Sequence, residues 1–296
     1  MSEFKELLKA RTREAEEIIR KYLPEEKGHQ RLIMEAMNYS MNAGGKRLRP
    51  LLMMESCRLF GGDIREAEPF MAAIEMIHTS SLIHDDLPCM DNDRFRRGKE
   101  STWAKFGEDF GVLAGDALIV EAFAAAAKGI VASAHPERAG RAMGILAEKT
   151  GIYGMIGGQV VDVQLTNQPI PKDKLDFIYR LKTGALLEAS MIIGAVLAGV
   201  GEEQQEKMSG IALNAGLAFQ IRDDILDVTS SQEVLGKPVG SDEKNCKTTY
   251  VTLEGIDAAK EEAARLCEAA VSALGSLGGK NEFLEQLLLM LAAREK

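Results

Sequence analysis

The sequence predicts an all-α protein, and three observations carry this prediction. Helical periodicity runs through most of the 296 residues, and runs of alternating apolar and polar residues, the pattern of strands, are missing. Leu, Ala, Met, Glu and Lys are plentiful, whereas aromatic residues make up only 5% of the chain. This balance favours helices over sheets. A hydrophobic fraction of 46% is enough for a sizeable core.

The expected helices follow one another along the whole chain. Gly61-Gly62 and Gly199 stand where helices should end, since glycine readily adopts the conformation that terminates a helix. No Pro/Ser-rich linker, low-complexity tract or repeat interrupts the chain, so a single domain over residues 1–296 is expected. Two polar stretches, residues 87–101 and 230–249, resist a helical interpretation. The expected helices cover residues 2–22, 28–41, 47–60, 65–87, 108–130, 137–149, 153–165, 172–182, 184–199, 203–229, 255–273 and 281–294.

Charge and cysteine content narrow the classes of function. The net charge is −9 and the pI about 5.2, so no nucleic-acid partner is expected. The four cysteines lack CxxC or disulfide-framework spacing and are expected to be reduced thiols. The amphipathic start lacks a signal-peptide core. The most apolar stretch, residues 185–200, is too short to span a bilayer and carries Glu188. A cytoplasmic protein without stable membrane insertion is therefore expected.

The first chemically suggestive stretch is an acidic cluster followed by arginines. Asp85, Asp86 and Asp91 lie close together, and Arg96 and Arg97 follow. Carboxylates at this density repel one another and favour binding of a cation. Mg²⁺ prefers oxygen ligands and commonly bridges carboxylates to phosphates, while arginine suits phosphate oxygens. A solvated loop of mixed charge is the alternative interpretation of this stretch taken alone.

A second acidic cluster lies in the expected helix 203–229. On a helix, Asp223 and Asp227 are separated by one turn, so their carboxylates point the same way and can share a hydrated Mg²⁺. An isolated DDxxD is weak evidence, because exposed helices produce it by chance. Here Phe219, Ile221 and Ile225 surround it, which indicates carboxylates emerging from a largely buried helix.

Basic residues at helix boundaries form a third feature. Gly44-Gly45 precede Lys46, Arg47 and Arg49 at a helix start, a suitable place for phosphate. Further candidate cations are Lys182, Lys237 and Lys247. Each of these lysines taken singly would be an ordinary surface residue.

The combination is specific. The order GGKRLRP, HxxxxxHDDxxxxD, RRG, KTG, FQxxDDxxD and GKxxGxD, with a final Lys, resembles trans-type isoprenyl diphosphate synthases, in particular bacterial farnesyl (geranyltranstransferase) and geranylgeranyl diphosphate synthases. The resemblance spans roughly residues 40–250. It implies an antiparallel helical bundle of the isoprenoid synthase type with a deep central apolar cavity, and a homodimer. The implied reaction condenses isopentenyl diphosphate with an allylic diphosphate (dimethylallyl or geranyl) and releases diphosphate.

The resemblance also assigns roles to residues. Two or three Mg²⁺ ions on the allylic diphosphate are implied, with Arg96, Lys182, Lys237 and more weakly Lys247 contacting that diphosphate. Thr183 and Gln220 match positions near the reacting carbons, and the roles of His84, Gln159 and Asp162 stay open. The implied metal ligands are Asp85, Asp86, Asp91, Asp223, Asp224 and Asp227; the implied isopentenyl diphosphate pocket consists of Lys46, Arg49, His78 and Arg97.

Product length is expected to depend on the helix that precedes Asp85. Ile74, Ile77, Ser80 and Ser81 should line the shaft for the growing chain. Farnesyl diphosphate is the expected product, and the two small serines leave geranylgeranyl diphosphate as an alternative. A class I terpene cyclase or a non-catalytic helical subunit is more remote. The first would have no use for the basic motifs, and the second should have lost carboxylates.

Overall fold

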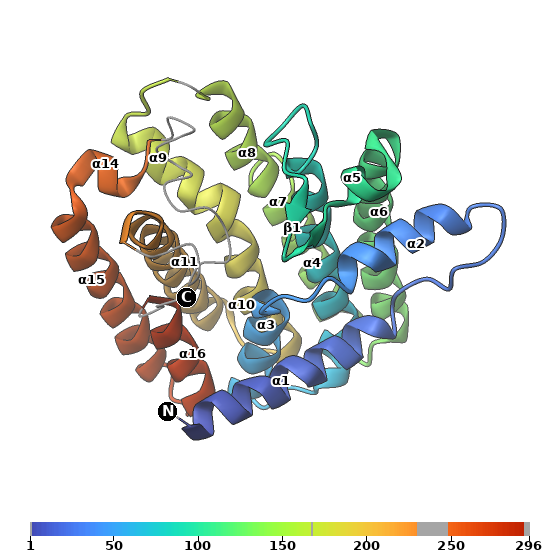
Figure 1. The fold of residues 1–296 in the computed structure, drawn as a ribbon. Helices are drawn as coiled ribbons and strands as arrows, with labels where there is room; N and C mark the ends of the chain where they lie inside the picture. Colours follow the sequence, from blue (N-terminus) through green and yellow to red (C-terminus); the bar gives the residue numbers. More distant parts are fainter. Residues whose placement is uncertain (1, 167, 230–247, 293–296) are drawn as a thin grey trace. The chain divides into compact units, whose positions relative to one another are not determined.

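The computed structural model describes residues 2–166, 168–229 and 248–292, which are helical except for turns, loops and one short hairpin (Figure 1). The all-α prediction is therefore confirmed. The chain packs as two compact units, one made of Met1–Met54 and Asp63–Met143, the other of Glu55–Gly62 and Gly144–Lys296. Whether they fold as the expected single domain stays a prediction.

The first unit is built around helix α4 (Ile64–Asp85), which is buried on nearly every side. Asp63 caps its start by accepting a hydrogen bond from the backbone N–H of Arg65 at 3.0 Å. Helix α6 (Glu108–Ala132) packs along α4; a β-carbon at Gly129 would lie 2.5 Å from the Pro69 ring. The unit also contains α1 (Ser2–Arg20), α2 (Arg31–Met41), β1 (Phe95–Arg96), β2 (Lys99–Glu100), α5 (Thr102–Phe106) and the first parts of α3 (Leu48–Leu59) and α7 (Pro136–Thr150).

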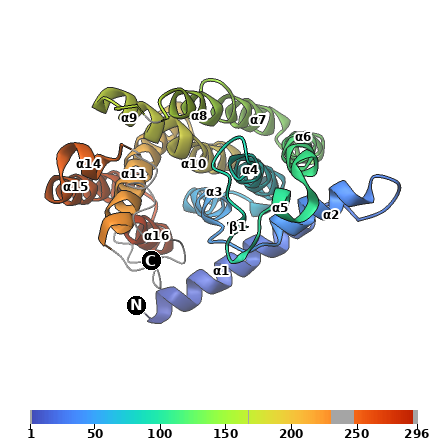
Figure 2. The same ribbon diagram turned by 45° about the horizontal axis from the view of Figure 1, so that its top comes forward.

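The second unit is centred on the long helix α11 (Glu202–Thr229), which packs against α10 (Ala185–Ala198) and α15 (Ile256–Gly275). Figure 2 shows α11 beside α15 and α14 (Tyr250–Glu254). A π-helical segment, η1 (Tyr179–Gly184), joins α9 (Lys172–Ile178) directly to α10. The unit is completed by α8 (Met155–Gln164), α16 (Glu282–Ala292) and the remaining parts of α3 and α7.

Glycine ends two of the helices as predicted. Gly61 has φ +69° and Gly199 has φ +87°, both in the left-handed region. The backbone N–H of Gly62 donates to the carbonyl of Cys57 at 2.9 Å, and the N–H of Val200 donates to the carbonyl of Ala195 at 3.3 Å. These bonds satisfy carbonyls that the helix itself leaves open.

Three local features differ from the expectation. The polar stretch after α4 is non-helical, as predicted, but it contains the hairpin of β1 and β2. Helices α5 and α14 were not predicted, because five residues are too few for periodicity to register. The predicted break at residue 183 is not a break; α9, η1 and α10 form one continuous helical run.

Within the residues that the structure describes, two helical runs are long and apolar enough to cross a membrane by length and composition alone, Glu108–Ala132 and Lys172–Ala198. This is weak evidence, since core helices have the same properties. In the second run 72% of the apolar window is buried inside the protein, as expected of a core helix. The expected lack of membrane insertion stays a prediction.

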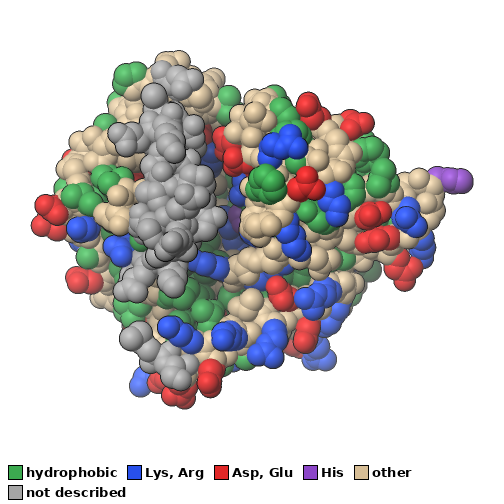
Figure 3. Space-filling view, viewed as in Figure 1, with side chains coloured by type: hydrophobic (Ala, Val, Ile, Leu, Met, Phe, Trp, Pro, Cys, Tyr) green, Lys and Arg blue, Asp and Glu red, His purple; other side chains and the backbone are tan. Residues whose placement is uncertain are grey.

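On the face drawn in Figure 3, Lys and Arg side chains lie together with Asp and Glu side chains.

Candidate active site

The first acidic cluster lies where α4 ends. Asp85 is the last residue of the helix, and Asp86 follows as its C-cap. The chain then folds back on itself: the N–H of Asp91 donates to the carbonyl of Asp85 at 2.9 Å, and the N–H of Asp93 donates to the carbonyl of Asp86 at 3.1 Å. This tight return brings the backbone of Asp91 beside that of the two earlier aspartates, as the sequence motif implies.

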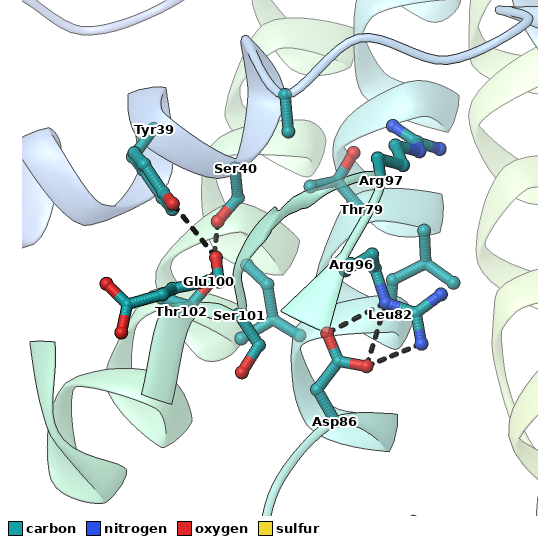
Figure 4. Close-up of a pocket in the computed structure, with 12 residues that line it drawn as sticks. Tyr39, Ser40, Thr79, Leu82, Asp86, Arg96, Arg97, Glu100, Ser101 and Thr102 are labelled. Atoms are coloured by element: carbon teal, nitrogen blue, oxygen red, sulfur yellow. Dashed lines mark hydrogen bonds and ion pairs between the residues drawn. The ribbon is translucent and has the colours of Figure 1, made fainter. Parts of the chain in front are cut away.

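The β1–β2 hairpin places the first of its two arginines against this cluster. Its two turn residues, Arg97 and Gly98, have φ of +54° and +76°, the combination of a type I′ turn. Arg96, in β1, donates from Nε to both carboxylate oxygens of Asp86, at 2.8 Å each (Figure 4). Burial of Asp86 raises the pKa of its carboxyl, while its bonds with Arg96 act in the opposite direction. Arg96 therefore neutralises a buried carboxylate at the predicted site.

The second arginine of the hairpin reaches the glycine-rich loop. Arg97 donates to the carbonyl of Gly44. Gly45 has φ +130°, and a β-carbon there would lie 2.7 Å from the Arg97 guanidinium carbon. Glycine is thus required at position 45 both for the backbone conformation and for the close approach of this cation. The sequence signal for the pair was the GGKRLRP and RRG order.

Positive charge accumulates where these elements meet. The pKa of Arg49 is lowered to about 10, first by burial and further by nearby Arg97. Burial, together with Arg49, Arg97 and other arginines, holds the pKa of His78 well below its usual range. Among the described residues the buried Nε of Arg49 has no hydrogen-bond partner. The structure therefore brings together three of the four residues predicted for isopentenyl diphosphate, in surroundings suited to an anion. The fourth, Lys46, is exposed beside Gly45.

Arg47, although it lies between two predicted phosphate contacts, is a structural residue. It is buried, and its guanidinium donates to Glu75 Oε1 at 2.8 Å and to the carbonyl of Met41 at 2.6 Å. The Nε atom lies 3.5 Å from Glu16 Oε1. Sequence reasoning missed this ion pair, because nothing in the sequence distinguishes Arg47 from the cations beside it.

A small cavity lies beside Asp86 and Arg97, and Figure 4 draws the residues that line it. Its volume is about 30 Å³, and Thr79, Ser101 and Thr102 contribute to its lining. The buried hydroxyl of Ser101 has no partner among the described residues. Such a space is large enough for one or two water molecules.

In the second unit, the predicted residues of η1 contact α8 and α11. Lys182 forms an ion pair with Asp162 at 2.6 Å, and the Thr183 hydroxyl donates to Gln220 Oε1 at 3.0 Å. A β-carbon at Gly158 would overlap the backbone of Lys182, so α8 approaches η1 closely. Asp162, whose role the sequence left open, thus holds a predicted catalytic lysine. Gln159 lies on the same helix.

The aspartates of the second cluster differ in their surroundings. Asp224 is buried, with its Oδ2 accepting hydrogen bonds from the Tyr179 hydroxyl at 2.6 Å and from the Tyr250 N–H at 2.9 Å. Asp227 is also buried, whereas Asp223 is half-buried. Asp224 therefore ties η1 and α14 to α11. The two tyrosines carry no sequence signal that would have identified them.

Carboxylates are the oxygen donors that Mg²⁺ prefers, so the chemistry of both clusters fits this ion. Among the described residues, no three His, Cys, Asp or Glu side chains gather into a ready-made metal cage. An ion bound by one or two carboxylates, with water and substrate phosphate as its other ligands, agrees with both observations. The Mg²⁺ assignments stay predictions.

The remaining predicted residues are partly described. Ile74, Ile77 and Ser80 are buried in α4, and Ser81 is half-buried. The Ser80 hydroxyl donates to the carbonyl of Ile77 at 2.8 Å. That these residues line a central apolar shaft stays a prediction. Lys237 and Lys247 lie outside the described residues.

Comparison with known proteins shows where the chain belongs. Residues 30–286 match the polyprenyl synthetase family. A chloroplastic geranylgeranyl pyrophosphate synthase from Catharanthus roseus is 49% identical over 238 residues, covering 79% of this chain but only 66% of the relative. The chain thus spans about two thirds of that relative's length.

Solved structures match nearly the whole chain. An FPP/GFPP synthase from Zymomonas mobilis has a TM-score of 0.87 at 32% identity, covering 98% of this chain and 99% of that one. A Helicobacter pylori geranyltransferase, crystallised with magnesium and isoprenyl diphosphate, has a TM-score of 0.84 at 31% identity, covering 97% and 96%. The chain therefore belongs to the polyprenyl synthetase family and has the all-α isoprenoid synthase fold.

Proposed function

We propose that the chain is a short-chain prenyltransferase that condenses isopentenyl diphosphate with allylic diphosphates. The observation that carries the proposal is the convergence of Arg49, His78 and Arg97 beside the Arg96–Asp86 pair. A cationic pocket adjoining an acidic cluster suits two diphosphates bound in different ways, one by side-chain cations and one through carboxylate-held Mg²⁺. Family membership and the relatives' names support the same reaction.

Different residues bind the two diphosphates. Arg49, Arg97 and Lys46 hold the isopentenyl diphosphate together with His78, whose pKa burial and nearby arginines keep well below its usual range in the ligand-free protein. Arg96, Lys182 and Lys237 contact the allylic diphosphate. Mg²⁺, held by the two aspartate clusters, would neutralise the charge that develops on the departing diphosphate. Thr183 and Gln220 present oxygen dipoles to the cationic carbon.

Farnesyl diphosphate is the proposed product, and geranylgeranyl diphosphate is the second candidate. Two observations favour the latter: Ser80 and Ser81 are small, and the Catharanthus relative is named for that product. The Zymomonas structure is named an FPP/GFPP synthase, so names alone support either length.

Incubation with dimethylallyl diphosphate, isopentenyl diphosphate and Mg²⁺, followed by mass analysis, tests both points. A C15 or C20 diphosphate identifies the product, and a cyclic hydrocarbon or no conversion would refute the proposal. Asp85→Ala and Asp223→Ala should each lower the rate by roughly three or more decades. Their melting temperatures should stay equal or rise, because removing a carboxylate relieves repulsion in the metal-free protein.

A cytoplasmic homodimer is proposed as the working form. Helices α2 and α6 in the first unit border a hollow of about 550 Å³ that is lined by Ile33, Met37, Leu113 and Val120 among others. The Leu113 side chain is 53% exposed and the Val120 side chain 69%, an unusual degree of exposure for such apolar residues in one place. If a second copy covers this surface, Val120→Glu should give a monomer by light scattering. Val131 lies at the end of the same helix and is 89% exposed, and Val131→Glu should leave the dimer intact.

A further inference from the structure

Two glycines of α6 face the residues that flank the Asp85-Asp86 pair. Gly111 and Gly115 are one helical turn apart. A β-carbon at Gly111 would lie 2.8 Å from Leu87 Cδ2, and one at Gly115 would overlap the imidazole of His84. His84 precedes the two aspartates and Leu87 follows them. The absence of side chains at both positions on α6 thus lets this helix contact the chain on each side of the acidic pair.

His84 is also bonded to the same helix. Its Nε2 donates to the carbonyl of Val112 at 3.1 Å and lies 3.6 Å from Asp116 Oδ1. Because a carbonyl only accepts, this contact places the ring proton on Nε2. The imidazole is therefore confined by the space over Gly115 and oriented by a specific acceptor.

The position of this contact matters for the acidic cluster. His84 belongs to the last turn of α4, and its own carbonyl accepts from the N–H of Leu87 at 3.2 Å. The two residues between these anchored points are Asp85 and Asp86. Any rotation of the helix end would redirect both carboxylates, and the His84 contact with α6 opposes such a rotation.

We propose that His84, seated on Gly115, is a positioning residue that holds Asp85 and Asp86 in the orientation required for Mg²⁺ and diphosphate. This inference rests on the function proposed above. It differs from a pure packing role in what it predicts: loss of packing lowers stability, whereas loss of positioning weakens metal-dependent diphosphate binding. Residues that orient metal ligands typically contribute about 10–100-fold to metal affinity or activity.

The matched control lies on the same pair of helices. Gly129 also belongs to α6 and also approaches α4, where a β-carbon would lie 2.5 Å from Pro69. Gly129→Ala therefore disturbs α4–α6 packing about four helical turns away from the acidic cluster. A β-carbon at Gly140, in α7, would meet no atom within 4 Å, so Gly140→Ala reports the effect of the substitution alone.

The experiment is a double-mutant cycle with two readouts. His84→Ala, Gly115→Ala and the double variant are compared with wild type for melting temperature and for calorimetric binding of inorganic diphosphate in the presence of Mg²⁺. Each single variant should weaken this binding roughly 10–100-fold. The affinity of the double variant for diphosphate should be no lower than that of the single variant with the lower affinity. The reason is that the methyl group added at position 115 then has no imidazole to displace. His84→Gln should recover most of the binding, since its amide can donate to Val112.

Three results would overturn the inference. The first is a double variant whose loss equals the product of the two single losses, which would show that the residues act independently. The second is binding at the wild-type level in both single variants, and the third is a loss of binding in Gly129→Ala as large as theirs. A wild-type protein that binds Mg²⁺ and diphosphate but transfers no prenyl group would refute the proposed function and leave the His84 inference standing.

Discussion

The buried ion pair between Arg47 and Glu75 permits a quantitative test of which arginine serves the fold. Both side chains are almost fully buried, 4% and 2% exposed, and Arg47 Nη1 lies 2.8 Å from Glu75 Oε1. Arg47→Met removes this partner together with the bond to the Met41 carbonyl. Leaving a buried charge uncompensated costs about 3–5 kcal/mol. At about 2–4 °C per kcal/mol for a chain of this size, the melting temperature should fall by about 6–20 °C.

The double variant Arg47→Met/Glu75→Met supplies the decisive comparison. It removes one positive and one negative charge, so the net charge near the proposed pocket is unchanged. Because replacing both partners by apolar groups is often neutral, most of the lost stability should return. The KM for isopentenyl diphosphate should then stay close to the wild-type value. Scanning calorimetry and steady-state kinetics measure both effects. A double variant no more stable than Arg47→Met, or one with a greatly raised KM, would refute a structural role for Arg47.

Three further predictions concern the same unit. Arg97→Ala should mainly raise the KM for isopentenyl diphosphate and Arg96→Ala should mainly impair use of the allylic substrate; identical effects in kinetics with each substrate varied in turn would contradict the assignment. Ser80→Tyr or Ser80→Phe should shorten the product by at least one isoprene unit, and unchanged chromatograms for both variants would show that Ser80 does not face the growing chain. The pKa of His78 is depressed in the folded protein, so the unfolded chain takes up protons first as the pH falls below about 6.5 and stability should fall there. Denaturant titrations between about pH 7 and 5 measure this loss, which should be smaller in His78→Gln.

Long helices were the most predictable part of the fold. The helix expected over residues 65–87 is found as Ile64–Asp85, because an apolar pattern sustained over several turns and a glycine-marked preceding end leave little choice. Helices α5 and α14 and the two-residue strands are too short for any periodic signal. The π-helical segment was unpredictable for a different reason. One extra residue in a turn shifts the apolar pattern by about 100°, which in the sequence resembles the end of one helix and the start of another, as was expected near residue 183.

The part of the candidate site that could be predicted from the sequence is the part where charged residues cluster. Asp86, Arg96 and Arg97 were identified by the density of charge in the sequence, and the structure brings them together. Tyr179 and Asp162 were not assigned roles, because their partners are distant in sequence or on another helix. Arg47 is a case in which charge in the sequence misleads. In the sequence it cannot be told from the cationic residues beside it, and only its burial against Glu75 gives it a different role.

The π-helical segment has a consequence for how a change in chain length would act on this protein. A π-turn holds one residue more than an α-turn, so deleting a single residue within Tyr179–Gly184 can restore a regular helix. The wider turn absorbs the extra residue, and α9 and α10 can therefore keep their buried faces after the deletion. The side chains inside the turn cannot all keep their directions, because each residue of an α-helix advances by about 100°. Lys182 or Thr183 would then leave Asp162 or Gln220. Deleting one residue here is thus enough to remove a contact of the candidate site while the helix itself is kept.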